Sequence, residues 1–166
     1  MARRNGASSI ALGGVLAALA VVILSMGTLI PVATFVCPVL CMLLLKVVLN
    51  RCGDRIGWAW YGAVAVLGAL LAPDKEAAAV FVFLGNYPII KPKMEKLPAK
   101  WLWKVLYFNA AILIMYWLLM HLFGMVRIAE EFAELGAVMT IVTLLLGNFT
   151  FLLLDRLLGR KLGRRK

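Results

Sequence analysis

The chain has 166 residues, of which 64% are hydrophobic and only 16% are charged. Soluble domains are about 45–50% apolar and about 25% charged, so this composition excludes a soluble globular domain and indicates one compact membrane domain. The net charge of +10 is a consequence of basic residues at the ends of apolar segments, with no nucleic-acid motif among them, so we expect contact with anionic lipids and no nucleic-acid partner.

Six apolar segments follow one another along the chain, and each predicts a membrane-spanning helix. Their approximate bounds are 8–30, 32–50, 57–73, 76–90, 101–125 and 134–158. A helix needs about 20 apolar residues to cross a bilayer core. The first, fifth and sixth segments meet this length comfortably, the second and third meet it narrowly, and the fourth is short. The prediction is therefore an all-α polytopic membrane protein with six transmembrane helices.

The fourth segment carries the sequence Gly85-Asn86-Tyr87-Pro88, which predicts a break or a tilt, because glycine weakens a helix and Pro88 removes a backbone donor. Irregular backbone at membrane depth is tolerated only where protein or a wet cavity covers it. We therefore expect this segment to be covered by other helices or to line a cavity. Asp74, just before it, is a predicted N-cap. After the fifth segment, residues 126–132 are expected to form a short surface helix or loop.

Basic residues are distributed unevenly between the two sides of these segments. Only Lys75 and Arg127 lie on one side, which leaves sixteen of the eighteen Lys and Arg residues on the other. Short cytoplasmic loops of membrane proteins collect Lys and Arg. The distribution therefore predicts that both termini are cytoplasmic and that the chain is a multi-pass protein of the cell membrane.

The first segment contains two rows of small residues at a spacing of four. The rows are Ser9-Gly13-Ala17 and Gly14-Ala18. Small residues let helix backbones approach closely in lipid, where no hydrophobic force holds helices together. Two interpretations stay open. We favour packing inside this chain over a groove for the helix of a partner subunit.

Polar residues of the fifth and sixth segments are candidates for an internal network or for ligand contact, because polar groups at membrane depth need partners. Helical spacing places Asn109, Tyr116 and Met120 on one face of the fifth segment. His121 and Trp117 lie near its outer end, where Trp117 is a possible ligand platform. The sixth segment contributes a stripe of Gly and Thr, which predicts either a tight helix seam or a polar lining, and Asn148 on a different face. The stripe comprises Gly136, Thr140, Thr143, Gly147 and Thr150.

Several features are absent from the sequence. No carboxylate lies near the middle of a segment, no nucleotide-binding or hydrolase motif occurs, and no cluster of His and acidic residues suggests a metal. Cys37 and Cys41 are spaced by four, and we interpret them as small packing residues rather than as metal ligands. We therefore expect no enzymatic activity, no cofactor and no metal.

The first segment, with Ile10-Ala-Leu-Gly-Gly-Val-Leu-Ala-Ala-Leu-Ala20 and a turn at Leu29-Ile-Pro31, resembles the membrane-embedded S components of energy-coupling factor transporters. The likeness covers most of the chain in architecture and only the first helix in motif. It implies a substrate-binding subunit for a vitamin-like micronutrient, working with a transmembrane T component and cytoplasmic ATPases.

In that family, small residues of the first helix meet the T component, a role that would map onto Gly13, Gly14, Ala17 and Ala18. The family usually has Ala where this chain has Gly, and its loop after the first helix is usually longer. The substrate pocket would lie in the outer halves of the later helices. The residues expected there are Trp117, Met120, His121, Met139, Thr140 and Thr143.

Two other functions fit the same helix count. One is a non-transporting membrane scaffold, similar to the cell-shape proteins resembling MreD. The other is a protein that translocates a lipid or a lipid-linked intermediate, for which the basic surface would suit anionic headgroups.

Overall fold

The computed structural model describes the backbone of residues 2–29, 33–121 and 126–159, and the side chains of residues 7–27, 34–121 and 141–159. These residues form helices and turns and contain no strand, which confirms the predicted all-α class. The helices are α1 (Ala2–Ser25), the 3-10 helix η1 (Met26–Leu29), α2 (Ala33–Cys52), α3 (Asp54–Leu71), α4 (Lys75–Leu84), α5 (Tyr87–Met94), α6 (Lys100–His121) and α7 (Val126–Gly159).

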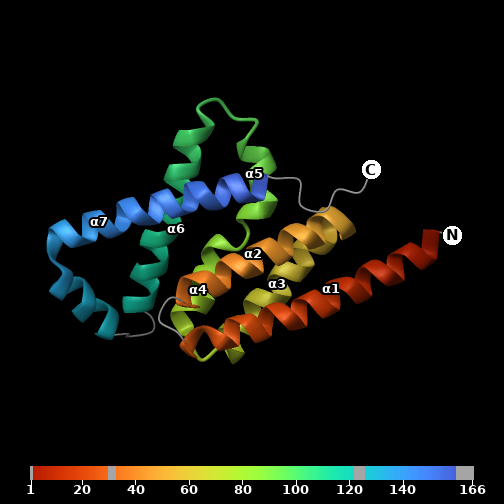
Figure 1. Cartoon of the computed structure of the whole chain (residues 1–166), viewed down its shortest axis with the longest axis horizontal. Helices are drawn as coiled ribbons and strands as arrows, with labels where there is room; N and C mark the ends of the chain where they lie inside the picture. The colour runs from red at the N-terminus through yellow and green to blue at the C-terminus, as the bar shows by residue number, and fades with distance from the viewer. Residues whose placement is uncertain (1, 30–32, 122–125, 160–166) are drawn as a thin grey trace.

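The helices pack in two groups that share α4. Helices α1, α2 and α3 lie side by side, and α4 packs against both α2 and α6 (Figure 1). Apolar side chains of α1 to α4 form one buried cluster around Leu24, Leu45 and Phe81. A second cluster joins α4 to α7 around Met115 and Phe151.

Four helices contain a stretch long and apolar enough to cross a membrane. These stretches are Ala7–Ser25, Thr34–Cys52, Lys100–His121 and Ile141–Gly159. They correspond to the first, second, fifth and sixth predicted segments, so the chain is a membrane protein with several apolar helices. The third predicted segment forms α3, which begins three residues earlier than expected, with the charged pair Asp54-Arg55 in its first turn.

The fourth predicted segment is broken, as expected from its sequence. Helix α4 ends at Leu84 and α5 begins at Tyr87. The backbone N–H of Gly85 donates to the Phe81 carbonyl at 2.7 Å, and the Asn86 carbonyl accepts from Ile89 at 3.0 Å. These two bonds close the end of α4 and the start of α5 on either side of the break.

Asp74 caps α4, which confirms the predicted N-cap. Its Oδ1 accepts from the backbone N–H groups of Glu76 and Ala77, both at 3.0 Å. Its Oδ2 accepts from the Thr34 hydroxyl at 2.8 Å, so the cap also ties the start of α4 to the start of α2.

The last helix is longer than predicted. Residues 126–132, expected to form a separate surface element, are the first turns of α7, which continues to Gly159 over 34 residues. At about 1.5 Å per residue this is about 51 Å, more than a bilayer core of about 30 Å. Figure 1 shows α7 changing direction along its length rather than running as one straight rod.

Candidate functional site

Three charged side chains are buried where α5, α6 and α7 meet. Asp155 of α7 is 4% exposed, Lys91 of α5 is 5% exposed and Lys104 of α6 is 3% exposed. Charged groups are almost never buried to this extent unless they are paired, and in a membrane protein such residues are functional candidates by default. This charge cluster is therefore the strongest candidate site among the described side chains.

The Asp155 carboxylate is the centre of the cluster. Its Oδ1 accepts from the Tyr87 hydroxyl at 2.6 Å and from Lys91 Nζ at 2.5 Å, and its Oδ2 accepts from Lys104 Nζ at 2.8 Å. Lys91 Nζ also donates to the backbone carbonyl of Asp155. Removing charges from water is expensive, and close, well-directed bonds of this kind are what offset that cost.

The break in the fourth segment positions two members of the cluster. Tyr87 is the first residue of α5, and Lys91 follows one turn later on the same helix face. The Tyr87 ring is stacked on Tyr107 at 5.8 Å and contacts the Phe151 ring at 4.7 Å. The Tyr107 hydroxyl lies within hydrogen-bond reach of the Asn86 side-chain oxygen and the Phe83 carbonyl, which share its single proton, so α6 holds the broken backbone in place.

The cluster carries a charge imbalance in its buried part. Two lysines and one aspartate leave a net charge of +1, and the nearest compensating group is Glu95. The Glu95 side chain is 47% exposed, and its Oε1 lies 3.5 Å from Lys91 Nζ and 3.7 Å from Lys104 Nζ. Both distances exceed the roughly 2.7–2.9 Å of a charge-assisted hydrogen bond. The Trp101 ring lies 5.4 Å from Lys104 Nζ and gives a cation–π contact.

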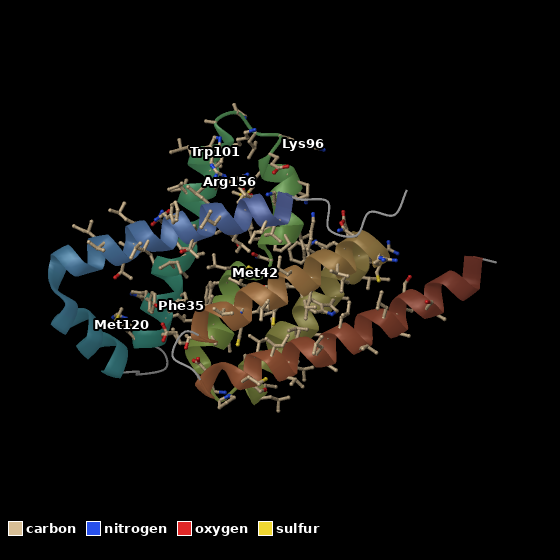
Figure 2. All side chains as sticks on the ribbon, viewed as in Figure 1. Phe35, Met42, Lys96, Trp101, Met120 and Arg156 are labelled. Carbon is tan, nitrogen blue, oxygen red and sulfur yellow. The ribbon has the colours of Figure 1, made fainter. Side chains whose placement is uncertain are left out.

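The cluster lies close to one end of the helix bundle. Lys104 is four residues after the start of α6, and Asp155 is four residues before the end of α7. Four residues of helix correspond to about 6 Å. Figure 2 shows Trp101 and Lys96 at this end of the molecule, with Met120 and Phe35 toward the opposite end.

The sequence contained a signal for this cluster that our interpretation did not use. Asp155 is the only acidic residue of the last predicted segment apart from Glu134 at its first position, and Lys104 lies inside the fifth segment rather than before it. Lys104 was counted among the basic residues between the fourth and fifth segments, where charges are solvated, and Asp155 was given no role. A carboxylate inside one apolar segment and a lysine inside another indicate a pair between helices.

Two predicted residues, Asn109 of α6 and Asn148 of α7, bond to each other. Each side-chain amide donates to the other residue's side-chain oxygen, at 3.0 and 3.2 Å. Each also donates to a carbonyl of its own helix at 2.8 Å. This reciprocal pair is an interhelical contact between α6 and α7, which answers the need for a partner that the sequence implied for Asn148.

The other predicted residues of α6 lie toward the opposite end of the bundle from the charge cluster. The Tyr116 hydroxyl donates to Glu76 of α4 at 2.7 Å, and Met120 packs against the second apolar cluster. Trp117 is 58% exposed and its ring is stacked on His121, which is also exposed. Tyr116 and Met120 thus contact other helices inside the bundle, whereas Trp117 and His121 lie on its surface.

The predicted stripe on the last helix is only partly described. The side chains of Met139 and Thr140 lie outside the described residues, as does position 136. Thr143 is exposed on α7, and the backbone of Gly147 packs near the Phe108 ring, 3.3 Å from where a Cβ would lie. Thr150 donates to the Leu146 carbonyl of its own helix. Gly147 therefore belongs to the α6–α7 seam, while Thr143 and Thr150 are on the outside of it.

The two small-residue rows of α1 face different surroundings. In the first row, Gly13 is buried near Ile56 of α3, Ala17 packs against the first apolar cluster, and the Ser9 carbonyl accepts from Cys52 Sγ at 3.3 Å. In the second row, Gly14 and Ala18 are exposed. One row is thus used inside the chain, and the other lies on its surface.

The chain was compared with protein-family models, curated proteins and solved structures, and none of them matches it.

Proposed function

We propose that this chain is the membrane-embedded substrate-binding subunit of a micronutrient uptake transporter. In this proposal it crosses the cell membrane six times with both termini in the cytoplasm. It works with a partner membrane protein of the T-component type and with cytoplasmic ATPases. Helix α1 is the element that meets the partner.

The observation that carries the proposal is the division of α1 into two small-residue faces. The face with Gly13 and Ala17 packs on α2 and α3, and the face with Gly14 and Ala18 is exposed. Ala7 and Ala11 extend the exposed face toward the start of the helix. Backbones approach closely across such faces in lipid, so the exposed face suits a second transmembrane helix.

The proposed substrate region is the end of the bundle opposite the charge cluster. Polar groups of three helices gather there, with Asp74 and Glu76 at the start of α4, Thr34 on α2 and Tyr116 on α6. Ligand sites are built from a few polar groups in apolar surroundings, and Met120 beside Tyr116 supplies apolar surface. This region supports an organic substrate with hydrogen-bonding groups.

The role of α1 is tested with Gly14→Leu and Ala18→Leu, followed by co-purification with the partner proteins of the host membrane. A leucine on the exposed face keeps the helices further apart, so we expect the yield of the partner to fall at least tenfold while the chain itself stays folded. Ala110→Leu is the matched control, because Ala110 is also an exposed alanine within a predicted span.

Gly13→Leu distinguishes the role of the buried face of α1 from that of the exposed face. Because Gly13 is buried against α3, this variant should lower the thermal stability of the isolated chain, whereas Gly14→Leu should not. If Gly14→Leu and Ala18→Leu leave the yield of the partner unchanged, the exposed face of α1 is not the docking face. A partner complex of cell-shape or cell-wall proteins would favour the scaffold function.

The substrate is tested directly on protein purified without added ligand. We expect mass spectrometry to detect a co-purified small molecule, and a panel of vitamins to contain at least one compound that raises the melting temperature. Tyr116→Phe should reduce that rise. Absence of both a bound molecule and any thermal shift would count against a substrate-binding subunit.

A further inference from the structure

The charge cluster has three properties that its role as a contact between helices does not require. Its buried part has a net charge of +1, one of its lysines has spare hydrogen-bond donors, and a half-exposed carboxylate lies at its edge. Each property concerns the binding of an anion, and none depends on the proposed transport function.

Lys104 has the spare donors. An ammonium group has three N–H donors. Within the described part of the chain, Lys104 Nζ donates one hydrogen bond, to Asp155 Oδ2, and its contact with Glu95 is 3.7 Å. A buried donor without an acceptor costs free energy comparable to a lost hydrogen bond. A ligand oxygen next to Lys104 Nζ would remove that cost.

Glu95 compensates the buried charge from a position that a ligand can take. Its carboxylate approaches both lysines, but at 3.5 and 3.7 Å it is too distant for the strong bonds that Asp155 makes. Because the side chain is half-exposed, it can turn into solvent without leaving a buried polar group behind. An incoming group with one negative charge would then restore neutrality and could approach both ammonium groups more closely.

The surroundings indicate where that group comes from. The cluster is about one helical turn from the ends of α6 and α7, beside Trp101, Trp103 and Leu102, which are all exposed. Tryptophan side chains mark the level of lipid headgroups, and basic residues at that level attract anionic lipids. A phospholipid phosphodiester carries one negative charge and lies at this depth.

We infer that Lys91, Lys104 and Trp101 form a binding site for the phosphodiester of an anionic phospholipid, with Glu95 as the group that the lipid displaces. The phosphate oxygens bind the two ammonium groups and the acyl chains lie along the exposed apolar surface of α6. Asp155 and Tyr87 hold the lysines in place. The two ammonium groups suit any phosphate group, and the position of the site at headgroup depth in the membrane favours a lipid over free phosphate.

The experiment uses the full chain in mild detergent and native mass spectrometry to measure binding of phosphatidylglycerol, phosphatidylcholine and inorganic phosphate. We expect one tightly held phosphatidylglycerol per chain, with phosphatidylcholine at least tenfold weaker because its headgroup has no net charge. Inorganic phosphate at millimolar concentration should not displace the lipid. Displacement by phosphate at such concentrations would overturn the assignment to a lipid.

Glu95→Gln is the decisive variant, because it changes an exposed side chain and leaves the buried bonds intact. Removing the competing carboxylate should tighten phosphatidylglycerol binding by about threefold to fivefold, the range expected from a half-exposed ion pair. Asp54→Asn is its matched control, because it removes the same charge from an exposed residue on another helix. Equal affinity in these two variants would overturn the site.

Lys104→Gln tests the lysine itself and should weaken phosphatidylglycerol binding on the order of tenfold or more. Lys100→Gln, which changes an exposed lysine of the same helix, is its control and should change the affinity by less than about twofold. If both variants weaken binding equally, the lipid is held by general surface charge and the proposed site is wrong.

Discussion

At the scale of single residues, Asp155 is the side chain on which the most interactions depend. From α7 it holds two lysines and a tyrosine that belong to two other helices, α5 and α6. A buried pair of ions is often no more stable than an apolar pair of the same size, because both ions lose their water. The position is nevertheless sensitive to change, because removal of one partner leaves the others charged and unpaired.

Asp155→Asn should therefore be strongly destabilising. The substitution keeps the size of the side chain and leaves two buried lysines with no buried counter-ion, which typically costs about 3–5 kcal/mol. The free energy of unfolding in detergent, measured by denaturant titration, checks this value. Asp54→Asn is the control, because Asp54 is exposed and its loss should change the free energy by less than about 0.5 kcal/mol.

The double variant Asp155→Asn, Lys104→Met shows whether the loss of stability in Asp155→Asn comes from unpaired charge. Removing one of the two lysines removes part of the uncompensated charge, so the double variant should be more stable than Asp155→Asn alone. Additive losses would show that the three groups do not act as one network.

Sequence patterns predicted some residues of the structure and missed others, for a physical reason. Asp74 was predicted as a cap because its role depends on the next three residues of the chain. The cluster of Lys91, Lys104 and Asp155 depends on how α5, α6 and α7 approach one another. A charged residue inside an apolar segment indicates that it needs a partner, but nothing local shows which distant residue that partner is, and lysines near a segment end are usually solvated.

At the scale of helices, the break between α4 and α5 depends on Gly85. A Cβ at this position would lie 2.9 Å from two carbons of the Phe81 ring and would also collide with the Phe81 carbonyl oxygen. A backbone atom cannot turn away as a side chain can, so the break itself would have to shift. The glycine is thus required by a close approach.

Gly85→Ala should destabilise the protein by about 1–3 kcal/mol, the range seen when extra atoms are forced into a packed site. Gly62→Ala is the control, because Gly62 lies inside α3 with nothing within 4 Å of the added Cβ. That change should be neutral or stabilising by up to about 1 kcal/mol, since alanine favours helix over glycine. Thermal unfolding of both variants provides the measurement, and equal melting temperatures would contradict the proposed role of Gly85.

The Asn109–Asn148 pair joins α6 to α7 and gives a second prediction at this scale. Leucine at either position removes the reciprocal hydrogen bonds, and a cycle of the two single variants and the double variant isolates their coupling. We expect a coupling of about 0.6–1.7 kcal/mol, as found for hydrogen bonds between membrane helices. A coupling indistinguishable from zero would mean that each amide is satisfied by its own helix carbonyl.

The helices themselves could be predicted more fully than their contacts. Apolar segments long enough to span a bilayer gave α1, α2, α6 and most of α7, and Gly85-Asn86 gave the break. The start of α7 was missed because Glu130 and Glu131 suggested a surface element, although charged residues are compatible with a helix that extends beyond the membrane. Which face of α1 is buried could not be predicted, because Gly13 and Gly14 are equally suited to both roles.

At the scale of the whole molecule, the two ends of the bundle differ in chemistry. The end with the charge cluster holds the exposed Trp101 and Trp103 and the basic residues from Lys91 to Lys104. The opposite end holds the Asp74 cap, the Tyr116–Glu76 bond and the exposed Trp117–His121 stack. A lipid site at the first end and a substrate region at the second are compatible, because they use different helices or different ends of the same helix.

The proposed orientation of these ends is tested with single cysteines in a background lacking Cys37, Cys41 and Cys52. Pro73→Cys and Lys96→Cys place one exposed thiol at each end. Because basic residues concentrate at the end with Lys96, we expect a membrane-impermeant maleimide to label Pro73→Cys in intact cells. Lys96→Cys should react only after the cells are permeabilised. Labelling of both thiols in intact cells would contradict the predicted topology, and labelling of Lys96→Cys alone would reverse it, placing the charge cluster at the outer leaflet.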